Sequence, residues 1–156
     1  MKNSSLCYIE KDGAYLMLHR IKRKSDENGG KWIGIGGKFE EGESPEECCA
    51  REISEETGLV PNALVFRGIV TFVSDEYGTE YMHLFTCSDF SGEISECDEG
   101  VLEWVKIESV PYLELWEGDR IFLKLLADDL PPFLLKLVYK GASLVSATLD
   151  GQNLDL

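Results

Sequence analysis

The sequence lacks any apolar run long enough to cross a bilayer, since a transmembrane helix needs about 20 consecutive apolar residues. The opening stretch MKNSSLCYIEKDG also lacks the apolar segment of a signal peptide. We therefore expect a cytoplasmic protein that has no membrane partner.

The sequence lacks a metal or disulfide motif made of cysteines. The five cysteines include no C-x-x-C pair, and only Cys48 and Cys49 are adjacent. Adjacent residues on a helix point in different directions, so this pair suits neither a disulfide nor a zinc site. We expect reduced thiols, which agrees with a cytoplasmic setting.

Basic residues are few, because 15 Lys and Arg stand against 29 Asp and Glu and leave a net charge of −14. So acidic a surface disfavours a nucleic-acid backbone, and we expect no nucleic-acid polymer as a partner. Small phosphorylated substrates stay open, because bound cations reverse the local field. The chain length suits a single domain over residues 1–156 with a buried core.

Short apolar stretches alternate with turn signals along most of the chain. Loops are predicted over 21–31 and 89–100. Strands are predicted over 6–9, 14–20, 32–35, 63–73, 80–87, 101–107, 133–139 and 143–149, and helices over 45–57, 109–113 and 120–127. Strands outnumber helices and do not alternate with them regularly. We therefore expect an α+β sandwich around a mixed sheet rather than a doubly wound parallel sheet.

The helix over Pro45–Thr57 carries the clearest local signals. Ser44 suits the N-cap, Pro45 suits the first helical position, and Glu47 completes a capping box. Gly58 suits the left-handed residue that follows a helix.

Three glutamates of this helix, Glu52, Glu55 and Glu56, stand at i, i+3 and i+4 and therefore share a face. Arg51 alone cannot balance them, and like charges at this spacing repel one another. A solvated acidic face is the simplest interpretation. The alternative is a site for Mg²⁺ or Mn²⁺, which prefer clustered oxygen ligands.

A fixed frame surrounds these carboxylates. Its fixed positions are Gly37, Glu43, Arg51-Glu52-Ile53, Glu55-Glu56 and Gly58-Leu59. They are separated by spacers of five, seven, one and one residues, in that order. This frame resembles the signature of the Nudix hydrolase superfamily at every fixed position. The resemblance implies a Nudix-type α/β/α sandwich with a mixed β-sheet. It also implies an enzyme that hydrolyses a nucleoside diphosphate linked to another group.

The resemblance also implies roles for individual residues. Arg51 would orient the carboxylates, and Lys38 would contact a phosphate. Either Glu56 or Glu99 would take the proton from the attacking water; Glu99 lies where MutT-type members carry a metal-binding or catalytic glutamate. The implied ligands of Mg²⁺ or Mn²⁺ are Glu52, Glu55, Glu56, Glu99 and the backbone carbonyl of Gly36.

Beyond the frame, most of the chain resembles MutT-type 8-oxo-dGTP diphosphatases. The segment Trp116-Glu117-Gly118-Asp119 matches W-P-D-D of a human member, in which the tryptophan stacks on the base and the aspartates grip the purine edge. Gly118 replaces the first aspartate, and Ile33 replaces a base-contacting asparagine. Two polar contacts to the purine are therefore absent, although Trp116, Asp119 and Ile33 still mark the expected base site. Trp116 equally suits packing in the core.

Together these patterns predict an Mg²⁺-dependent pyrophosphohydrolase. Its substrate would be a nucleoside triphosphate such as the oxidised purine 8-oxo-dGTP, and its products the nucleoside monophosphate and pyrophosphate. Alternative substrates are ADP-ribose, a dinucleoside polyphosphate or a 5′-triphosphorylated RNA end. A non-catalytic nucleotide sensor is a third reading. In each case the partner is a small nucleotide, and we expect a monomer or a weak dimer.

Overall fold

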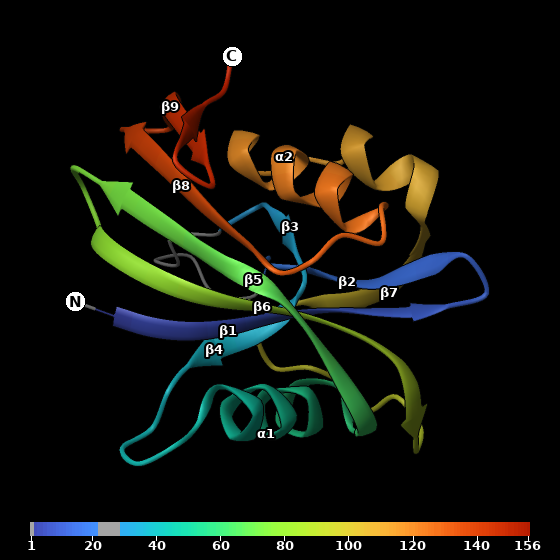
Figure 1. Ribbon diagram of the computed structural model, residues 1–156. Coiled ribbons are helices and arrows are strands. Elements are labelled where there is room, and N and C mark those ends of the chain that lie inside the picture. Colours follow the sequence, from blue (N-terminus) through green and yellow to red (C-terminus); the bar gives the residue numbers. More distant parts are fainter. Residues whose placement is uncertain (1, 22–28) are drawn as a thin grey trace.

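The computed structural model describes residues 2–21 and 29–156, in which a β-sheet lies between two helices (Figure 1). The helices are α1 (Pro45–Thr57) and α2 (Glu117–Leu126), and a 3₁₀ helix η1 covers Ile107–Tyr112. The strands are β1 (Lys2–Lys11), β2 (Ala14–His19), β3 (Trp32–Ile33), β4 (Ile35–Lys38), β5 (Val60–Ser74), β6 (Gly78–Ser91), β7 (Val101–Lys106), β8 (Phe133–Lys140), β9 (Ser143–Leu149) and β10 (Gln152–Asn153).

The strands run in the order β10-β9-β8-β5-β6-β1-β2-β3, with β4 beside β1 and β7 beside β2. The pairs β1–β6 and β5–β8 are parallel, and the other pairs are antiparallel. The sheet is therefore mixed, which confirms the predicted α+β sandwich. None of the helices in the described part of the chain is long and apolar enough to span a membrane.

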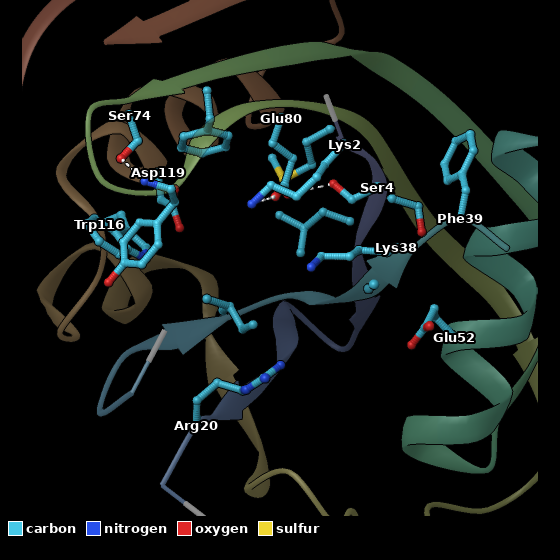
Figure 2. A pocket seen from close by; sticks show the side chains of 18 of the residues that line it. Lys2, Ser4, Arg20, Lys38, Phe39, Glu52, Ser74, Glu80, Trp116 and Asp119 are labelled. Atoms are coloured by element: carbon cyan, nitrogen blue, oxygen red, sulfur yellow. Dashed lines mark hydrogen bonds and ion pairs between the residues drawn. The ribbon is translucent and has the colours of Figure 1, made fainter. Parts of the chain in front are cut away.

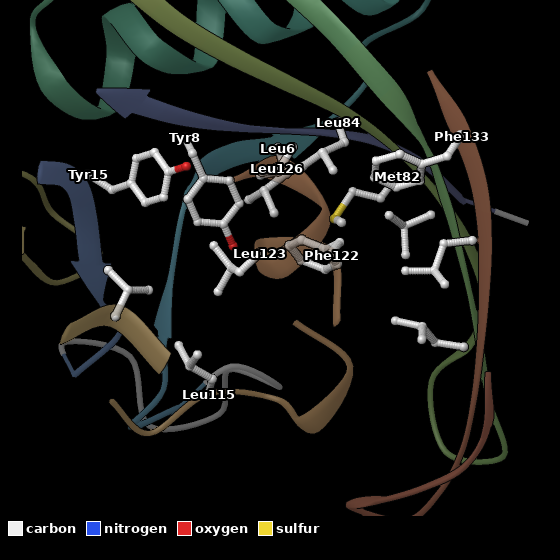
Figure 3. Packing of buried hydrophobic residues seen from close by; sticks show 14 of the residues in the cluster. Leu6, Tyr8, Tyr15, Met82, Leu84, Leu115, Phe122, Leu123, Leu126 and Phe133 are labelled. Carbon is white, nitrogen blue, oxygen red and sulfur yellow. The ribbon is translucent and has the colours of Figure 1, made fainter. Parts of the chain in front are cut away.

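Each helix covers one face of the sheet and buries its own hydrophobic cluster (Figure 1). Figure 3 shows the cluster under α2, where Phe122, Leu123 and Leu126 meet side chains of β1 and β6. The cluster under α1 joins Cys49 and Ile53 to the other face of the sheet. All five cysteines are buried and free.

The helix α1 begins and ends where the sequence predicts. The Ser44 hydroxyl accepts from the Glu47 N–H at 3.1 Å, and the Glu47 carboxylate accepts from the Ser44 N–H at 3.0 Å. Gly58 ends the helix in the left-handed conformation, with φ 80°. These are contacts between neighbouring residues, which explains why local sequence rules place both ends correctly.

Strands β5 and β6 are longer than predicted, and β6 extends to Ser91 inside the predicted acidic loop. Their antiparallel ladder continues past three register shifts, so cross-strand hydrogen bonds hold polar residues in extended backbone. The strand predicted over 32–35 is divided at Gly34 into β3 and β4, which pair with different strands. Most of the loop predicted over 21–31 lies outside the described residues.

The C-terminal end of α1 packs against the loop after β6, and we expect Gly58→Ala to disturb this contact. An added Cβ would lie 2.8 Å from Ser95 Oγ and 2.9 Å from the Glu93 carbonyl oxygen. The left-handed backbone alone costs an alanine about 1 kcal/mol. Urea unfolding should show a larger loss, because the close contacts add to that cost.

Gly151→Ala is the matched control, since Gly151 has φ +83° and open space at the Cβ position. Equal losses of stability in the two variants would show that the contact with Ser95 contributes nothing.

Candidate functional site

A cleft of about 620 Å³ crosses the sheet from α1 to the start of α2. Figure 2 shows Glu52 on α1 at one end, Trp116 and Asp119 at the other, and Lys38 between them. The cleft lining includes eight residues that the sequence singles out: Ile33, Gly36, Lys38, Arg51, Glu52, Glu99, Trp116 and Asp119. Glu55 and Glu56 do not line it.

Arg51 holds the acidic end of the cleft together. Its Nε and Nη2 donate to the two oxygens of Glu43 at 2.7 and 2.9 Å. Its Nη1 donates to Glu52 at 2.8 Å and to Glu55 at 3.1 Å, and its Nη2 donates to the Lys38 carbonyl at 3.0 Å. One guanidinium therefore joins the helix to the loop before it.

This arrangement shifts the pKa of the partners in ways that follow from their contacts. The hydrogen bonds from Arg51 hold the pKa of Glu43 below its usual range, and those to Glu43 raise the pKa of Arg51. Burial raises the pKa of Glu52, although the adjacent guanidinium opposes that shift. Glu43 thus anchors the loop to α1 through Arg51.

The three helix glutamates occupy different environments, although their spacing places them on one face. The Glu55 side chain is 58% exposed and the Glu52 side chain 15% exposed. Glu56 is buried and its carboxylate accepts from the Gly36 N–H at 3.1 Å. The helix therefore tilts this face against β4, and only part of it meets solvent.

Glu56 forms a carboxyl pair with Glu99. Burial and a hydrogen bond to Glu99 raise the pKa of Glu56 to about 10. Glu99 in turn lies 3.1 Å from the Arg20 guanidinium and faces the cleft. The structure therefore joins two glutamates that the sequence separates by more than 40 residues, and burial and the hydrogen bond to Glu99 favour the protonated form of Glu56.

The donor set at this end of the cleft fits a hard divalent cation. Gly37 makes room for the Glu52 carboxylate, because a Cβ at this position would lie 2.5 Å from it. Carboxylate oxygens are typical ligands of Mg²⁺ or Mn²⁺. Over residues 2–21 and 29–156, however, no three acidic, histidine or cysteine side chains already converge around a metal-sized space. Arg51 forms ion pairs with Glu43, Glu52 and Glu55 instead.

The far end of the cleft is formed by an aromatic pair. The rings of Trp116 and Tyr139 meet edge to face with centroids 5.3 Å apart, and Lys31 Nζ lies 4.8 Å from the Trp116 ring centroid. Trp116 is half-buried, packs against the α2 cluster and lines the cleft. It therefore serves as a packing residue and as a cleft wall at the same time.

Packing against β8 explains why position 118 is a glycine. Its N–H donates to the Tyr139 hydroxyl at 2.7 Å. A Cβ on Gly118 would lie 2.5 Å from Leu137 Cδ1 and 2.7 Å from that hydroxyl. Tyr139 therefore occupies the space that an aspartate side chain at this position would need.

Asp119 is fully buried at the same end of the cleft. Burial raises the pKa of Asp119 to about 7, although Arg120 and Lys31 oppose the shift. Near neutral pH its carboxyl group is therefore divided between the neutral form, which donates a hydrogen bond, and the ionised form, which accepts.

Several cleft residues carry no motif and were not predicted from the sequence, namely Lys2, Ser4, Arg20, Glu80 and Tyr139. Lys2 and Ser4 reach the cleft because β1 lies parallel to β6, and Tyr139 because β8 lies parallel to β5. Pairing between distant strands leaves no signal in the local sequence. Alternation of side chains along a strand shows only which residues of that strand share a face, and not which strand lies beside it.

Comparison with known proteins places these features in context. A family model described as NUDIX domain matches residues 3–126. An oxidized purine nucleoside triphosphate hydrolase of Danio rerio is 36% identical over 100 residues, which are 62% of this chain and 63% of that protein. An uncharacterized Nudix hydrolase of Bacillus subtilis is 31% identical over 118 residues, or 72% of this chain and 71% of that protein.

Among solved structures, the MutT protein from Bacillus halodurans superposes with a TM-score of 0.86 and 28% identity. That match covers 97% of this chain and 99% of the other. The alignment to the Danio rerio protein, in contrast, spans less than two thirds of that protein's length.

The raised pKa of Asp119 predicts a specific pH dependence of stability. Between pH 4 and 7 the folded state holds a proton on Asp119 that the unfolded chain releases, so stability falls as pH rises. This contribution amounts to about 1.4 kcal/mol for each pH unit in that window. Asp119→Asn should remove this pH dependence. The free energy of unfolding of the variant relative to that of the parent, measured with urea, should therefore be higher at pH 8 than at pH 5.5.

Asp155→Asn, at an exposed position, is the control and should follow the parent at both pH values. Parallel pH profiles for the parent and Asp119→Asn would contradict the buried, proton-binding carboxyl group.

Proposed function

The chain belongs to the NUDIX family, and from this membership we propose that it is a metal-dependent hydrolase of nucleoside triphosphates. The main support for this proposal is one continuous cleft, with Glu52 of α1 at one end and Trp116 and Asp119 at the other. Among possible substrates we propose oxidised purine triphosphates such as 8-oxo-dGTP. The Danio rerio relative, named as a hydrolase of oxidized purine nucleoside triphosphates, supports this choice.

The residues that would hold Mg²⁺ or Mn²⁺ are Glu52, Glu55, Glu56, Glu99 and the Gly36 carbonyl. When bound, such an ion polarises phosphoryl oxygens, lowers the pKa of a bound water and screens the charge of the leaving pyrophosphate. Protons and Arg51 now neutralise these carboxylates, so metal binding competes with both and should weaken in acid.

The cationic side chains of the cleft position the phosphates. Lys38 extends into the middle of the cleft, between the carboxylates and Trp116 (Figure 2). Its ammonium group is placed to contact a phosphate whose base lies at the far end. Arg51 has a different role, because its donors are occupied by Glu43, Glu52 and Glu55. It orients these carboxylates and keeps them apart from one another.

The Glu56–Glu99 pair is the proposed proton acceptor. Glu99 lines the cleft, and its carboxylate would accept the proton from the attacking water. Glu56 does not line the cleft, and its hydrogen bond to Glu99 would hold that carboxyl group in position. Water then attacks phosphorus, and the products are the nucleoside monophosphate and pyrophosphate.

The base is proposed to stack on Trp116, with its edge at Asp119. Asp119 can donate or accept near neutral pH, so it can match either a carbonyl or an N–H on a purine. Ile33 adds an apolar contact in the same wall, and the Tyr139 hydroxyl lies where Gly118 lacks a side chain.

The test of this function is a panel of 8-oxo-dGTP, normal deoxynucleoside triphosphates, ADP-ribose and diadenosine polyphosphates, with Mg²⁺ and detection of released pyrophosphate or phosphate. We expect the highest kcat/KM for a purine triphosphate, with pyrophosphate as a product. A higher kcat/KM for ADP-ribose or a diadenosine polyphosphate would show that the substrate class is that compound and not the nucleoside triphosphates. No turnover across the panel would instead favour the nucleotide-sensor reading.

Glu56→Gln should separate catalysis from folding. The amide can still accept from the Gly36 N–H and can donate to Glu99, as the protonated acid does. Turnover should fall on the order of 100-fold or more, because the amide cannot ionise and so removes one carboxylate of the proposed metal site. Without metal, the Tm should be equal to the parent's or higher.

Added Mg²⁺ should raise the Tm of the parent and not that of Glu56→Gln, because only binding to the folded state stabilises it. Glu41→Gln is the control, since Glu41 is exposed in the same glutamate-rich stretch. If Glu56→Gln retained full turnover, Glu56 would have neither proposed role.

A further inference from the structure

The sheet face under α2 changes from apolar to charged as it runs out into the cleft. On β6 the side chains of this face follow the order Leu84, Met82 and Glu80. On β1 the matching order is Leu6, Ser4 and Lys2, because the two strands are parallel and in register. The core therefore ends at Met82, and Glu80 is the next position outward.

Glu80 is fixed in the cleft wall by two contacts from β1. The Ser4 hydroxyl, on a residue only 4% exposed, donates to Glu80 Oε2 at 2.8 Å. Lys2 Nζ lies 3.9 Å from Glu80 Oε1. Figure 2 shows the carboxylate between these two groups at the wall of the cleft.

Two apolar side chains border Glu80 on this wall. In the same row of the sheet Glu80 is paired with Phe72 on β5, and Met82, at the edge of the core, is the next side chain of this face on β6. A flat ring lying on Phe72 and Met82 would present an edge to Glu80. A carboxylate offers about four acceptor sites, so acceptance from Ser4 and attraction to Lys2 leave capacity for a further donor.

We propose that Glu80 determines base specificity by accepting a hydrogen bond from the 2-amino group of a guanine-type base. This inference rests on the proposed function, because it assumes that a nucleobase occupies the Trp116 end of the cleft. A guanine edge carries two adjacent donors, the ring N–H and the 2-amino group, which match a carboxylate. Adenine places an acceptor nitrogen beside its amino group, and a carboxylate repels that nitrogen. Oxidation at C8 leaves the 2-amino edge unchanged, so Glu80 would accept the same hydrogen bond from 8-oxo-dGTP.

A purely structural role is the competing account, in which Ser4, Glu80 and Lys2 only tie the beginning of β1 to β6. The two accounts differ in what a substitution changes. Loss of a structural tie lowers the Tm and affects every substrate equally. Loss of a base contact affects only substrates that carry the 2-amino group.

The experiment compares kcat/KM for dGTP and dITP, which differ only in the 2-amino group. A hydrogen bond to a charged acceptor corresponds to a preference of roughly 10- to 100-fold, and we expect the parent to favour dGTP by that factor. Glu80→Leu should abolish the preference by lowering kcat/KM for dGTP alone. Glu80→Gln, which still accepts from Ser4, should reduce it partly.

Glu103→Gln is the matched control, since Glu103 is an exposed strand glutamate on β7 outside the cleft lining. It should leave the dGTP-to-dITP ratio at the parent's value. An equal ratio in the parent and in Glu80→Leu would overturn the proposal, as would a parent that shows no preference for dGTP.

Binding of dGMP and dIMP, measured by calorimetry, separates this proposal from the proposed function. Tighter binding of dGMP by the parent but not by Glu80→Leu would support the role of Glu80 even if no triphosphate were hydrolysed. Equal binding of the two monophosphates by the parent would overturn it, whatever the turnover.

Discussion

The acidic end of the cleft depends on a single guanidinium. Arg51 donates to Glu43, Glu52, Glu55 and the Lys38 carbonyl, so one side chain joins α1 to the loop that enters it. Without this cation, carboxylates at i, i+3 and i+4 would repel one another and the helix would be destabilised. The same contacts hold the carboxylates apart, so a divalent cation would have to compete with an arginine already in place.

The two ends of the cleft place polar groups by different physical means. At the α1 end, charge is balanced by Arg51 and by Arg20, and burial favours the protonated form of Glu56. At the α2 end, burial is the dominant effect and raises the pKa of Asp119 to about 7. One cleft therefore combines a strongly charged region with a region where a carboxyl group is close to neutral. A nucleotide has the same division, with anionic phosphates at one end and an uncharged base at the other.

Sequence rules were most accurate where the determining contacts are local. The ends of α1 follow from Ser44, Glu47 and Gly58, which contact residues within four positions along the chain. The sequence rules were less accurate for β5 and β6, whose polar ends are held extended by cross-strand hydrogen bonds. The frame of spaced glutamates identified Glu52, Arg51 and Glu43 correctly as one unit. It did not predict that Glu56 turns inward, because burial on a helix depends on what packs against it.

By itself, the sequence determined the helix, its caps and the family, since capping and residue spacing act within one stretch of chain. It also predicted Trp116, Asp119 and Glu99 as residues of one site, and these do line one cleft. Only the tertiary structure decided that Glu56 hydrogen-bonds to Glu99, that Tyr139 fills the space beside Gly118, and that Lys2 and Ser4 fix Glu80. Each of these contacts joins strands or loops that are distant along the chain. Their register is set by the packing of the whole sheet, and no local pattern records it.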